Sequence, residues 1–346
     1  MERVLVIRLS SIGDIILASP FLRALKQDVN APDVDVVVRS EYADLVRWNP
    51  SVSTLYDLDV RKGVQGILRL RRSLRKNAYA AVYDLHDSLR SRLLRWRVGR
   101  SLRVARKFTL RRWLLVRFKI NLLRAAPPVT QRYLRTIRHV TALADPGLEL
   151  HIPDDVWLAA RSHAPVLTVN RPIVGLAPGA KHGTKMWLED RFASVGSRLV
   201  RELGVRIYLF GGPEDAARCA RIEEAIRSAG ASDDQIANLA GRLSLLESAS
   251  FMDDCTVLVT NDTGLMHMAS ARKRPVVAVF GPTVREFGFF PQGPEDIVIE
   301  RAELNCRPCS HIGGDHCPLG HFRCMREIGV DDVLDAVAHV LGSHRL

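Results

Sequence analysis

The chain has 346 residues, of which 47% are hydrophobic, and it carries a formal net charge of +12. This length is enough for two domains, each with its own hydrophobic core. The sequence predicts no secretion signal, because a short apolar segment follows Met-Glu-Arg without the basic, apolar and cleavage regions in order. No window reaches the roughly 18 consecutive apolar residues of a membrane-spanning helix. We therefore expect a cytoplasmic protein that is soluble or bound peripherally at a membrane.

The positive charge belongs to the first half of the chain. Residues 1–165 hold 30 Lys and Arg against 15 Asp and Glu, whereas the remainder holds 20 against 23. This asymmetry predicts an acidic partner for the first half: nucleic acid, an anionic membrane or a phosphorylated substrate. A solvated basic surface without a partner is the alternative.

The first half alternates predicted strands and helices. Apolar runs predict strands over residues 3–9, 35–41, 55–59 and 79–86, and helical periodicity predicts helices over 14–28, 63–77 and 133–144. Two basic segments containing Leu and Trp occupy residues 88–123 around a turn at 98–101. Residues 144–155, rich in Pro and acidic residues, are predicted to connect the two halves.

The alternation begins again in the second half. Strands are predicted to begin at residues 172, 205, 256 and 275, with helices over 189–203, 214–229, 245–255 and after residue 261. Strands that alternate with helices indicate parallel sheets. The sequence therefore predicts an α/β protein with two Rossmann-like domains that face each other across a cleft.

Four strands of the second half end in loops, "APGAKHGTK", "FGGPED", "TNDTGLMH" and "FGPT". Ligands of open α/β sheets bind beyond the carboxyl ends of the strands, and helix N-termini offer free N–H groups to anions. These loops predict a nucleotide or diphosphate site. None matches the Walker A or the dinucleotide GxGxxG pattern, which disfavours a P-loop ATPase and an NAD enzyme.

Asp262 and Thr263 stand before Gly264 at the predicted start of a helix. Backbone amides from Thr263 onward would bind a phosphate, while the Asp262 carboxylate would accept hydrogen bonds from sugar hydroxyls. The alternative is that Asp262 or Thr263 only caps the helix. His267, one turn further along, would face the same site or simply pack in the core.

Lys181 and Lys185 follow the first of these loops. An ammonium group there would neutralise a departing diphosphate. Ordinary surface lysines are the alternative.

The opening stretch, "VLVIRLSSIGDIILASPFLRAL", runs from a predicted strand into a helix. Ser11-x-x-Asp14 is compatible with a capping box, and a carboxylate also suits a helix N-terminus. The functional interpretation is that Asp14 is a general base, which would remove a proton from an acceptor hydroxyl. Gly13 would allow a tight backbone turn beside it.

Together, these segments resemble the bacterial heptosyltransferases of glycosyltransferase family 9, which build the inner core of lipopolysaccharide. The resemblance rests on the opening stretch, on "LAPGAKHGTKMWLEDRFASV" and on "VTNDTGLMHMASARKRPVVAVFGPT", in that order. The most specific element is D-T-G-x-x-H, Asp262 to His267. The resemblance covers nearly the whole chain.

The resemblance implies a GT-B fold and metal-independent transfer with inversion from a sugar nucleotide. It places the acceptor in an N-terminal domain, residues 1–155, and the donor in a C-terminal domain, residues 156–346. Asp14 is then the catalytic base and Lys185 binds the donor diphosphate. The predicted donor-binding set is Lys181, Thr184, Lys185, Glu214, Asp262, Thr263, Gly264 and His267. The segment Ala180–Thr184 departs from the hydroxyl residues that family members often carry before this lysine, which leaves the exact donor open.

The implied donor is ADP-heptose, and the implied acceptor is lipid A–Kdo or a later inner-core sugar at the cytoplasmic face of the inner membrane. Such an acceptor carries phosphates and carboxylates, which suits the basic first half. The predicted acceptor-binding set is Ser10, Gly13, Arg61, Lys62, Arg90 and Arg92. Residues 110–124 interleave cations with Trp113, Phe118 and leucines, as an interfacial helix would; a core helix with a basic outer face is the alternative.

Four cysteines, Cys306, Cys309, Cys317 and Cys324, cluster in the loop 306–324. Their spacing suits a structural Zn²⁺ site, and reduced packing thiols are an equal alternative. A disulfide or an iron–sulfur cluster is a third. No cofactor is expected to be required for catalysis.

Two other functions remain open at this point: a basic nucleic-acid-binding protein with a zinc module, and a related transferase that uses another nucleotide sugar. The first is disfavoured, because the basic residues and the cysteines lie in opposite halves and no readout helix accompanies the cysteines. We therefore expect no nucleic-acid partner. A nucleotide-binding pair of domains without catalysis is a further alternative.

Overall fold

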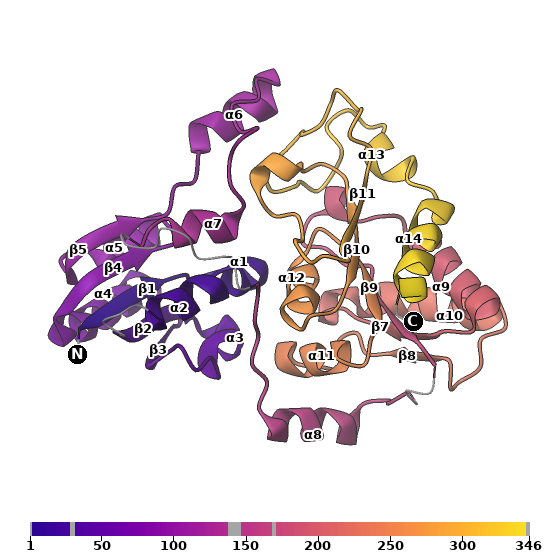
Figure 1. Ribbon diagram of the computed structural model, residues 1–346, viewed down its shortest axis with the longest axis horizontal. Helices are drawn as coiled ribbons and strands as arrows, with labels where there is room; N and C mark the ends of the chain where they lie inside the picture. Colours follow the sequence, from indigo (N-terminus) through magenta and orange to yellow (C-terminus); the bar gives the residue numbers. More distant parts are fainter. Residues whose placement is uncertain (1, 28–31, 138–146, 168–170, 344–346) are drawn as a thin grey trace. The chain divides into compact units, whose positions relative to one another are not determined.

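The computed structural model of the chain describes residues 2–27, 32–137, 147–167 and 171–343. They form two compact units, which Figure 1 shows coloured along the sequence. The first unit comprises Met1–Phe108 and Pro127–His151, and the second comprises Thr109–Ala126 and Ile152–Leu346.

The first unit is built on a parallel five-stranded sheet in the order β3-β2-β1-β4-β5. Its strands are β1 (Arg3–Ile7), β2 (Asp33–Arg39), β3 (Thr54–Leu58), β4 (Tyr79–Asp84) and β5 (Gly99–Val104). Its helices are α1 (Ile12–Ile16), α2 (Ser19–Lys26), α3 (Asp44–Arg47), α4 (Gly63–Leu74), α5 (Leu89–Arg95) and α7 (Val129–Leu134), with 3₁₀ turns η1 (Ser40–Tyr42), η2 (Val60–Lys62) and η3 (Arg75–Asn77). The chain winds outward in both directions from β1, so the carboxyl end of β1 is the switch point where such sheets bind ligands.

The second unit is built on a parallel six-stranded sheet in the order β11-β10-β9-β6-β7-β8. Its strands are β6 (Ile173–Ala177), β7 (Arg206–Leu209), β8 (Ile236–Asn238), β9 (Val257–Asn261), β10 (Val276–Phe280) and β11 (Ile297–Glu300). Its helices are α6 (Thr109–Phe118), α8 (Asp154–His163), α9 (Glu189–Leu203), α10 (Ala216–Ser228), α11 (Leu245–Met252), α12 (Gly264–Ala271), α13 (Arg323–Arg326) and α14 (Val330–Ser343), with 3₁₀ turns η4 (Gly183–Lys185), η5 (Pro213–Asp215) and η6 (Arg285–Phe287). Here the switch point lies between β6 and β9.

Helices cover both faces of the second sheet (Figure 1). Helices α9, α10 and α14 pack with β6, β7, β9 and β10 in one apolar cluster, while α11 and α12 lie on the other side of the strands. The central strands are therefore buried on both faces and consist largely of Val, Ile and Leu, as parallel sheets require. The helix predicted over 189–203 is confirmed as α9; it ends at Gly204, whose left-handed φ of 61° suits a residue without Cβ.

Several expected elements differ from the observed ones. The single helix predicted over 14–28 is two helices, α1 and α2, because Pro20 in the first turn of α2 has no N–H to continue the earlier hydrogen-bond ladder. The turn predicted at 98–101 is the beginning of edge strand β5, which pairs with β4. The helix predicted over 133–144 ends at Leu134 in α7, and residues 138–146 lie outside the described ranges.

The segment 109–126 packs with the second unit, although the sequence-based division at residue 155 assigns it to the first. The Lys119 ammonium donates hydrogen bonds to the carbonyl oxygens of Cys306, at 2.9 Å, and Pro308, at 2.6 Å. Asn121 donates to the Glu286 carboxylate at 2.7 Å. Across the residues that the structure describes, no helix is both long enough and apolar enough to cross a membrane.

The close packing of the second sheet makes one residue a test of its core. A Cβ added at Gly175 in β6 would lie 2.5 Å from Leu258 Cδ1 and 3.0 Å from the Phe210 ring. We expect Gly175→Ala to lower the free energy of unfolding by about 1–3 kcal/mol through overpacking, measured by urea denaturation. Gly342→Ala is the matched control, because a Cβ at Gly342 in α14 meets nothing within 4 Å. Equal stability of both variants would contradict the packing described here.

Candidate active site

The carboxyl end of β1 holds a buried ion pair. Arg8 follows β1 directly, its side chain is 9% exposed, and its Nη2 lies 2.5 Å from Asp14 Oδ1. Its Nη1 donates to the carbonyl oxygen of Leu85, after β4, and its guanidinium lies 5.7 Å from the centre of the Tyr133 ring. The guanidinium therefore links β1, β4 and α1 at the switch point of the first sheet.

Asp14 is held at both oxygens. Oδ1 pairs with Arg8, while Oδ2 accepts hydrogen bonds from the hydroxyl of Ser11, at 3.2 Å, and from its backbone N–H, at 3.5 Å. Burial raises the pKa of Asp14, but the Arg8 charge and the Ser11 hydrogen bonds outweigh this, so the pKa lies below its ordinary value. Asp14 is thus an ionised, partly exposed carboxylate that also caps α1, so the capping and base interpretations are compatible.

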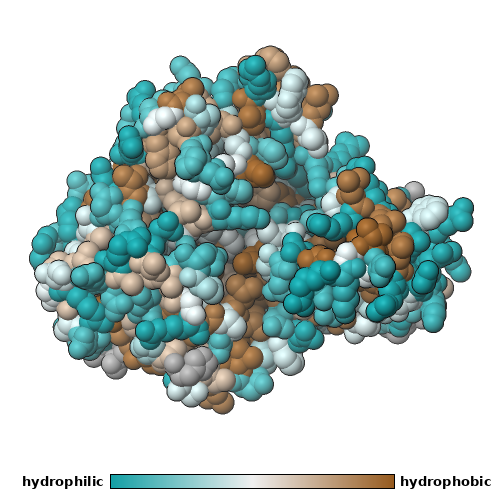
Figure 2. Space-filling view, turned by 180° about the vertical axis from the view of Figure 1, so that it is seen from behind, coloured by the Kyte–Doolittle hydropathy of each residue, from teal (hydrophilic) through white to brown (hydrophobic). Residues whose placement is uncertain are grey.

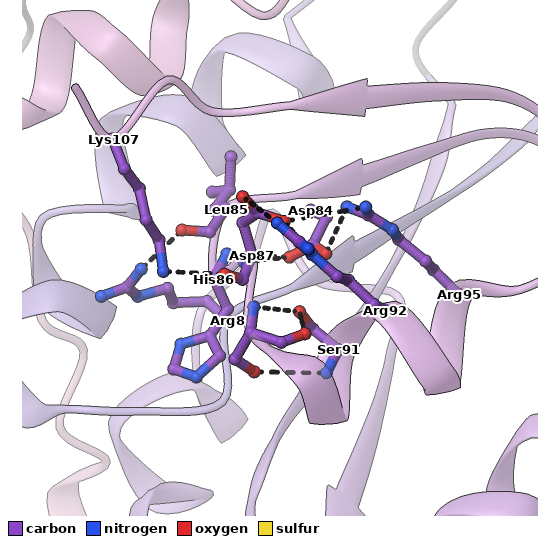
Figure 3. A network of polar contacts seen from close by, with 10 residues as sticks. Arg8, Asp84, Leu85, His86, Asp87, Ser91, Arg92, Arg95 and Lys107 are labelled. Carbon is purple, nitrogen blue, oxygen red and sulfur yellow. Dashed lines mark hydrogen bonds and ion pairs between the residues drawn. The ribbon is translucent and has the colours of Figure 1, made fainter. Parts of the chain in front are cut away.

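A second carboxylate, at the end of β4, organises the neighbouring loop (Figure 3). Asp84 is fully buried. Its carboxylate accepts hydrogen bonds from the backbone N–H groups of His86, at 2.9 Å, and Asp87, at 2.7 Å, and it forms an ion pair with Arg95 at 2.6 Å. Asp87 in turn makes a two-pronged contact with Arg92, at 2.9 and 3.2 Å. This network fixes the loop between β4 and α5 beside Arg8.

The predicted acceptor-binding residues are not all in this network. Ser10 lies in the β1–α1 connection, the buried Gly13 is the second residue of α1 rather than part of a turn, and Arg92 belongs to the Asp84 network. Arg90 is an exposed residue of α5, whereas Arg61 and Lys62 lie in η2, where both side chains approach Asp59 at the surface.

In the second unit, the loop after β6 is clamped by the end of β9. The buried Asn261 side chain donates to the carbonyl oxygens of Pro178, at 2.9 Å, and Gly179, at 3.3 Å, and accepts from the backbone N–H of Trp187 at 3.0 Å. Both ends of the loop that carries the predicted lysines are therefore tied to β9. Of these two lysines, Lys181 is exposed and Lys185 is partly buried.

Lys185 and Asp262 form the charged centre of this region. Lys185 Nζ lies 2.6 Å from Asp262 Oδ2, and the Thr283 hydroxyl donates to the same oxygen at 2.7 Å. Thr263 caps α12, since its hydroxyl oxygen accepts a hydrogen bond from the backbone N–H of Leu265 at 3.2 Å, and Gly264 is the first residue of that helix. The structure thus brings a cation, a carboxylate and a helix N-terminus together, an arrangement that suits a phosphorylated ligand.

Two further residues of the predicted donor set are His267 and Glu214. His267 is a buried residue of α12. Glu214 is exposed in η5, whereas its neighbour Asp215 is buried against Gly179, where an added Cβ would lie 2.1 Å from the Asp215 carboxylate. Burial raises the pKa of Asp215 above its ordinary value.

The Cys-rich loop, residues 306–324, contacts the surroundings of the Lys185–Asp262 pair at two positions. The buried Arg307 guanidinium donates to the carbonyl oxygens of Gly281, at 2.5 Å, and Thr283, at 2.8 Å. The Thr184 hydroxyl and backbone N–H exchange hydrogen bonds with the backbone of Gly314 at 2.8–2.9 Å. The loop therefore braces the residues on either side of the Lys185–Asp262 pair.

The cysteines themselves are free thiols. Burial raises the pKa of Cys309 and raises that of Cys324 to about 11. Throughout the ranges that the structure describes, no three or more His, Cys, Asp or Glu side chains are grouped so as to hold a metal ion. The four cysteines are near enough to one another to interact electrostatically, and the Zn²⁺ site expected at Cys306, Cys309, Cys317 and Cys324 stays a prediction.

Sequence reasoning missed the residues that position the charged groups. Arg8 and Asn261 stand next to predicted features, immediately after β1 and immediately before Asp262, and this adjacency was their only signal. Thr283 contacts Asp262, which lies 21 residues away in the sequence. Arg307 contacts the carbonyl oxygen of Thr283, which lies 24 residues away. Local patterns carry no information about such contacts.

Two parallel, doubly wound units, each with charged residues beyond its strand ends, have the GT-B fold, as the solved structures that resemble the chain do, which confirms the predicted fold class. Residues 67–317 match the profile of glycosyltransferase family 9 (heptosyltransferase). The chain belongs to this family and is a glycosyltransferase.

Individual relatives agree with this assignment. The chain is 29% identical over 300 residues to lipopolysaccharide heptosyltransferase 2 of Salmonella typhimurium, covering 82% of this chain and 84% of the relative. A family 9 glycosyl transferase of Veillonella parvula has a similar structure, with a TM-score of 0.80, 23% identity and coverage of 99% of this chain and 98% of that one. The ADP-heptose LPS heptosyltransferase II of E. coli follows, with a TM-score of 0.75, 23% identity and coverage of 99% and 100%.

Proposed function

We propose that the protein transfers a heptose from ADP-heptose to the inner core of lipopolysaccharide, with inversion at the anomeric carbon and without a catalytic metal. Family membership carries the reaction class, and heptosyltransferases of lipopolysaccharide are its curated relatives. The Lys185–Asp262 pair beside the N-terminus of α12 is the observation that supports a nucleoside-diphosphate donor. Membership of this family argues against the alternative function, that of a nucleic-acid-binding protein containing a zinc module.

In the proposed reaction, the ionised Asp14 accepts the proton of an acceptor hydroxyl as its oxygen bonds to the anomeric carbon of the heptose. The bond from that carbon to the diphosphate oxygen breaks, and ADP leaves with the bonding electrons. Lys185, supplemented by Lys181, supplies the positive charge that stabilises the leaving diphosphate. Asp262, which accepts a hydrogen bond from Thr283, holds the Lys185 ammonium in place for this role, and the amides from Thr263 onward bind phosphate.

The low pKa of Asp14 has a cost and a benefit for a general base. The carboxylate is ionised throughout the neutral range, but a weaker base removes a proton less readily. Proton removal therefore depends on a good leaving group, and an ADP diphosphate held by Lys185 provides one. The acceptor is proposed to be Kdo or an inner-core heptose, with Ser10, Gly13, Arg61, Lys62, Arg90 and Arg92 as candidate contacts.

The donor nucleotide is tested first by calorimetric titration of the purified protein with ADP, GDP, UDP and ADP-heptose in the presence of EDTA. Selective binding of ADP and ADP-heptose supports the proposal. Selective binding of GDP or UDP would instead favour a related transferase with another nucleotide sugar.

Asp14→Asn is expected to lower the rate of heptose transfer by about 100-fold or more, because the amide cannot accept the proton. ADP affinity, measured by calorimetry, should stay within about twofold, since Asp14 belongs to the first unit. Asp44→Asn is the control; Asp44 is an exposed residue of α3 that pairs with Arg47 at 2.9 Å. Turnover at the wild-type rate by Asp14→Asn would disprove the general-base role.

Lys185→Met is expected to weaken ADP binding by about tenfold or more, because the diphosphate loses a charge-assisted hydrogen bond. Lys181→Met should weaken it less, since Lys181 is exposed and its ammonium is more mobile. Calorimetry gives both dissociation constants. An unchanged affinity in Lys185→Met would remove this residue from the donor site.

We further propose that α6 and the residues after it bind the surface of an anionic membrane. Large apolar side chains are exposed along this segment, and residues 109–126 carry five Lys and Arg without an acidic residue. The exposed apolar residues are Leu110, Trp113, Phe118, Ile120 and Leu122. In Figure 2 hydrophobic and hydrophilic groups alternate at the upper tip of the molecule, where α6 lies. Such a mixture suits the boundary between headgroups and acyl chains.

The double variant Trp113→Ser/Phe118→Ser is expected to lower partitioning into phosphatidylcholine vesicles that contain phosphatidylglycerol by about tenfold, because two interfacial anchors are lost. Flotation measures the bound fraction, which should also fall with salt or without phosphatidylglycerol. Trp48→Ser removes an exposed Trp of the first unit and should have no effect. Wild-type partitioning of the double variant would exclude α6 as the membrane contact.

A further inference from the structure

Lys107 is the one cation of the network in Figure 3 that no carboxylate neutralises. Arg8 pairs with Asp14, Arg95 with Asp84 and Arg92 with Asp87. Lys107 Nζ donates to the carbonyl oxygen of Asp87 at 2.9 Å, and no ion pair within 4 Å joins it to any carboxylate of the described residues. The side chain is half-buried, in the segment that follows β5.

Arg8 and Lys107 lie close enough to repel each other. Burial lowers the pKa of Lys107, and the Arg8 charge lowers it further. Two like charges held together in this way by the fold, one of them on an almost fully buried side chain, favour an anion between them. Asp87, Asp84 and Asp14 offset part of this charge, but their carboxylates are already engaged by Arg92, Arg95 and Arg8.

His86 completes the cluster. Its side chain is partly buried beside both cations, and its Nδ1 is a buried atom for which the described chain provides no hydrogen-bond partner. Burial and the charges of Arg8 and Lys107 lower the pKa of His86 to about 4, so the ring is neutral at neutral pH. A neutral ring carries one N–H, and a buried nitrogen without a partner is costly unless a ligand supplies one.

We propose that Lys107, Arg8 and His86 form a binding site for an anionic group, a carboxylate or a phosphate, of the sugar acceptor. The Lys107 ammonium supplies the net charge, Arg8 adds to the field, and the His86 ring donates a hydrogen bond. This site rests on the proposed transfer reaction, because it lies next to the Arg8–Asp14 pair at the same end of the sheet. An acceptor anchored here by its charge presents its hydroxyl near the base.

Two of the other basic residues of this unit are poorer anchors. The Arg61 side chain is 87% exposed and that of Lys62 is 62% exposed, and both approach Asp59. Exposed ion pairs of this kind contribute little and lose conformational freedom when they bind. Lys107 is instead held in place before any ligand arrives, which lowers the cost of binding.

The first test compares Lys107→Met with Lys107→Arg in heptose transfer. We expect Lys107→Met to raise the KM for the acceptor at least about tenfold, with a smaller effect on kcat and no change in the KM for ADP-heptose, while Lys107→Arg restores part of the loss. Lys26→Met is the matched control, since Lys26 is a partly buried lysine of the same unit that donates to the carbonyl oxygen of Pro32 at 3.4 Å. Thermal melting checks that each variant is folded.

The second test does not depend on transfer. The ring resonance of His86, assigned with His86→Asn, is followed by NMR while inorganic phosphate or acetate is added. We expect a saturable shift in the wild type and in Lys26→Met that is lost in Lys107→Met; a shift with phosphate alone identifies a phosphate site, and one with acetate alone a carboxylate site.

The two proposals fail in different ways. A protein that binds these anions at His86 but transfers no heptose retains the anion site and refutes the proposed reaction. A wild-type acceptor KM in a folded, active Lys107→Met, or no shift of the His86 resonance with either anion, overturns the anion site.

Discussion

The first unit depends on how one guanidinium is satisfied. Arg8 leaves the central strand of the sheet and is almost completely buried, and a buried charge must be paired and hydrogen-bonded. Its partners come from three elements: Asp14 from α1, the Leu85 carbonyl after β4, and the face of Tyr133 from α7. The same contacts that make the charge tolerable fix the position and ionisation of Asp14. A single group therefore sets both the packing at this edge of the sheet and the ionisation of Asp14.

In the second unit, the charged group Lys185 is held in position by a longer chain of contacts. Arg307 holds the carbonyls of Gly281 and Thr283, the Thr283 hydroxyl holds Asp262, and Asp262 holds Lys185. Every link is a short hydrogen bond or ion pair between groups that are largely removed from water, where such interactions are strong and geometrically demanding. A flexible lysine thereby becomes an oriented cation.

The sequence was sufficient for the fold class and for the groups that follow strands directly. Alternating apolar strands and helices, together with the loops around Asp14 and Asp262, are local signals, and the strand ends of a parallel sheet necessarily meet at one edge. It was insufficient where tertiary contacts decide. Pro20 divides one predicted helix, β5 begins in a predicted turn, and the Cys-rich loop bonds to Thr184 across 130 residues. The cysteine spacing gave no indication that the backbone of Gly314 and the side chain of Arg307 would attach this loop to the loops after β6 and β10.

The attachment points of the Cys-rich loop also divide it into a part that tolerates change and a part that does not. Arg307 and Gly314 are fixed to the loops that follow β10 and β6, and the carbonyl oxygen of Asp315 lies so close to Gly183 that a Cβ there would stand 2.3 Å away. Beyond this point, residues 318–320 are exposed, and Gly320 has no atom within 4 Å of where a Cβ would be. Insertions and deletions are tolerated at exposed loop tips of this kind. The length of the loop is therefore free to vary around residues 318–320. The exposed Leu319, rather than Gly320 with its left-handed φ of 71°, is the place to attach a fluorescent reporter without disturbing Lys185.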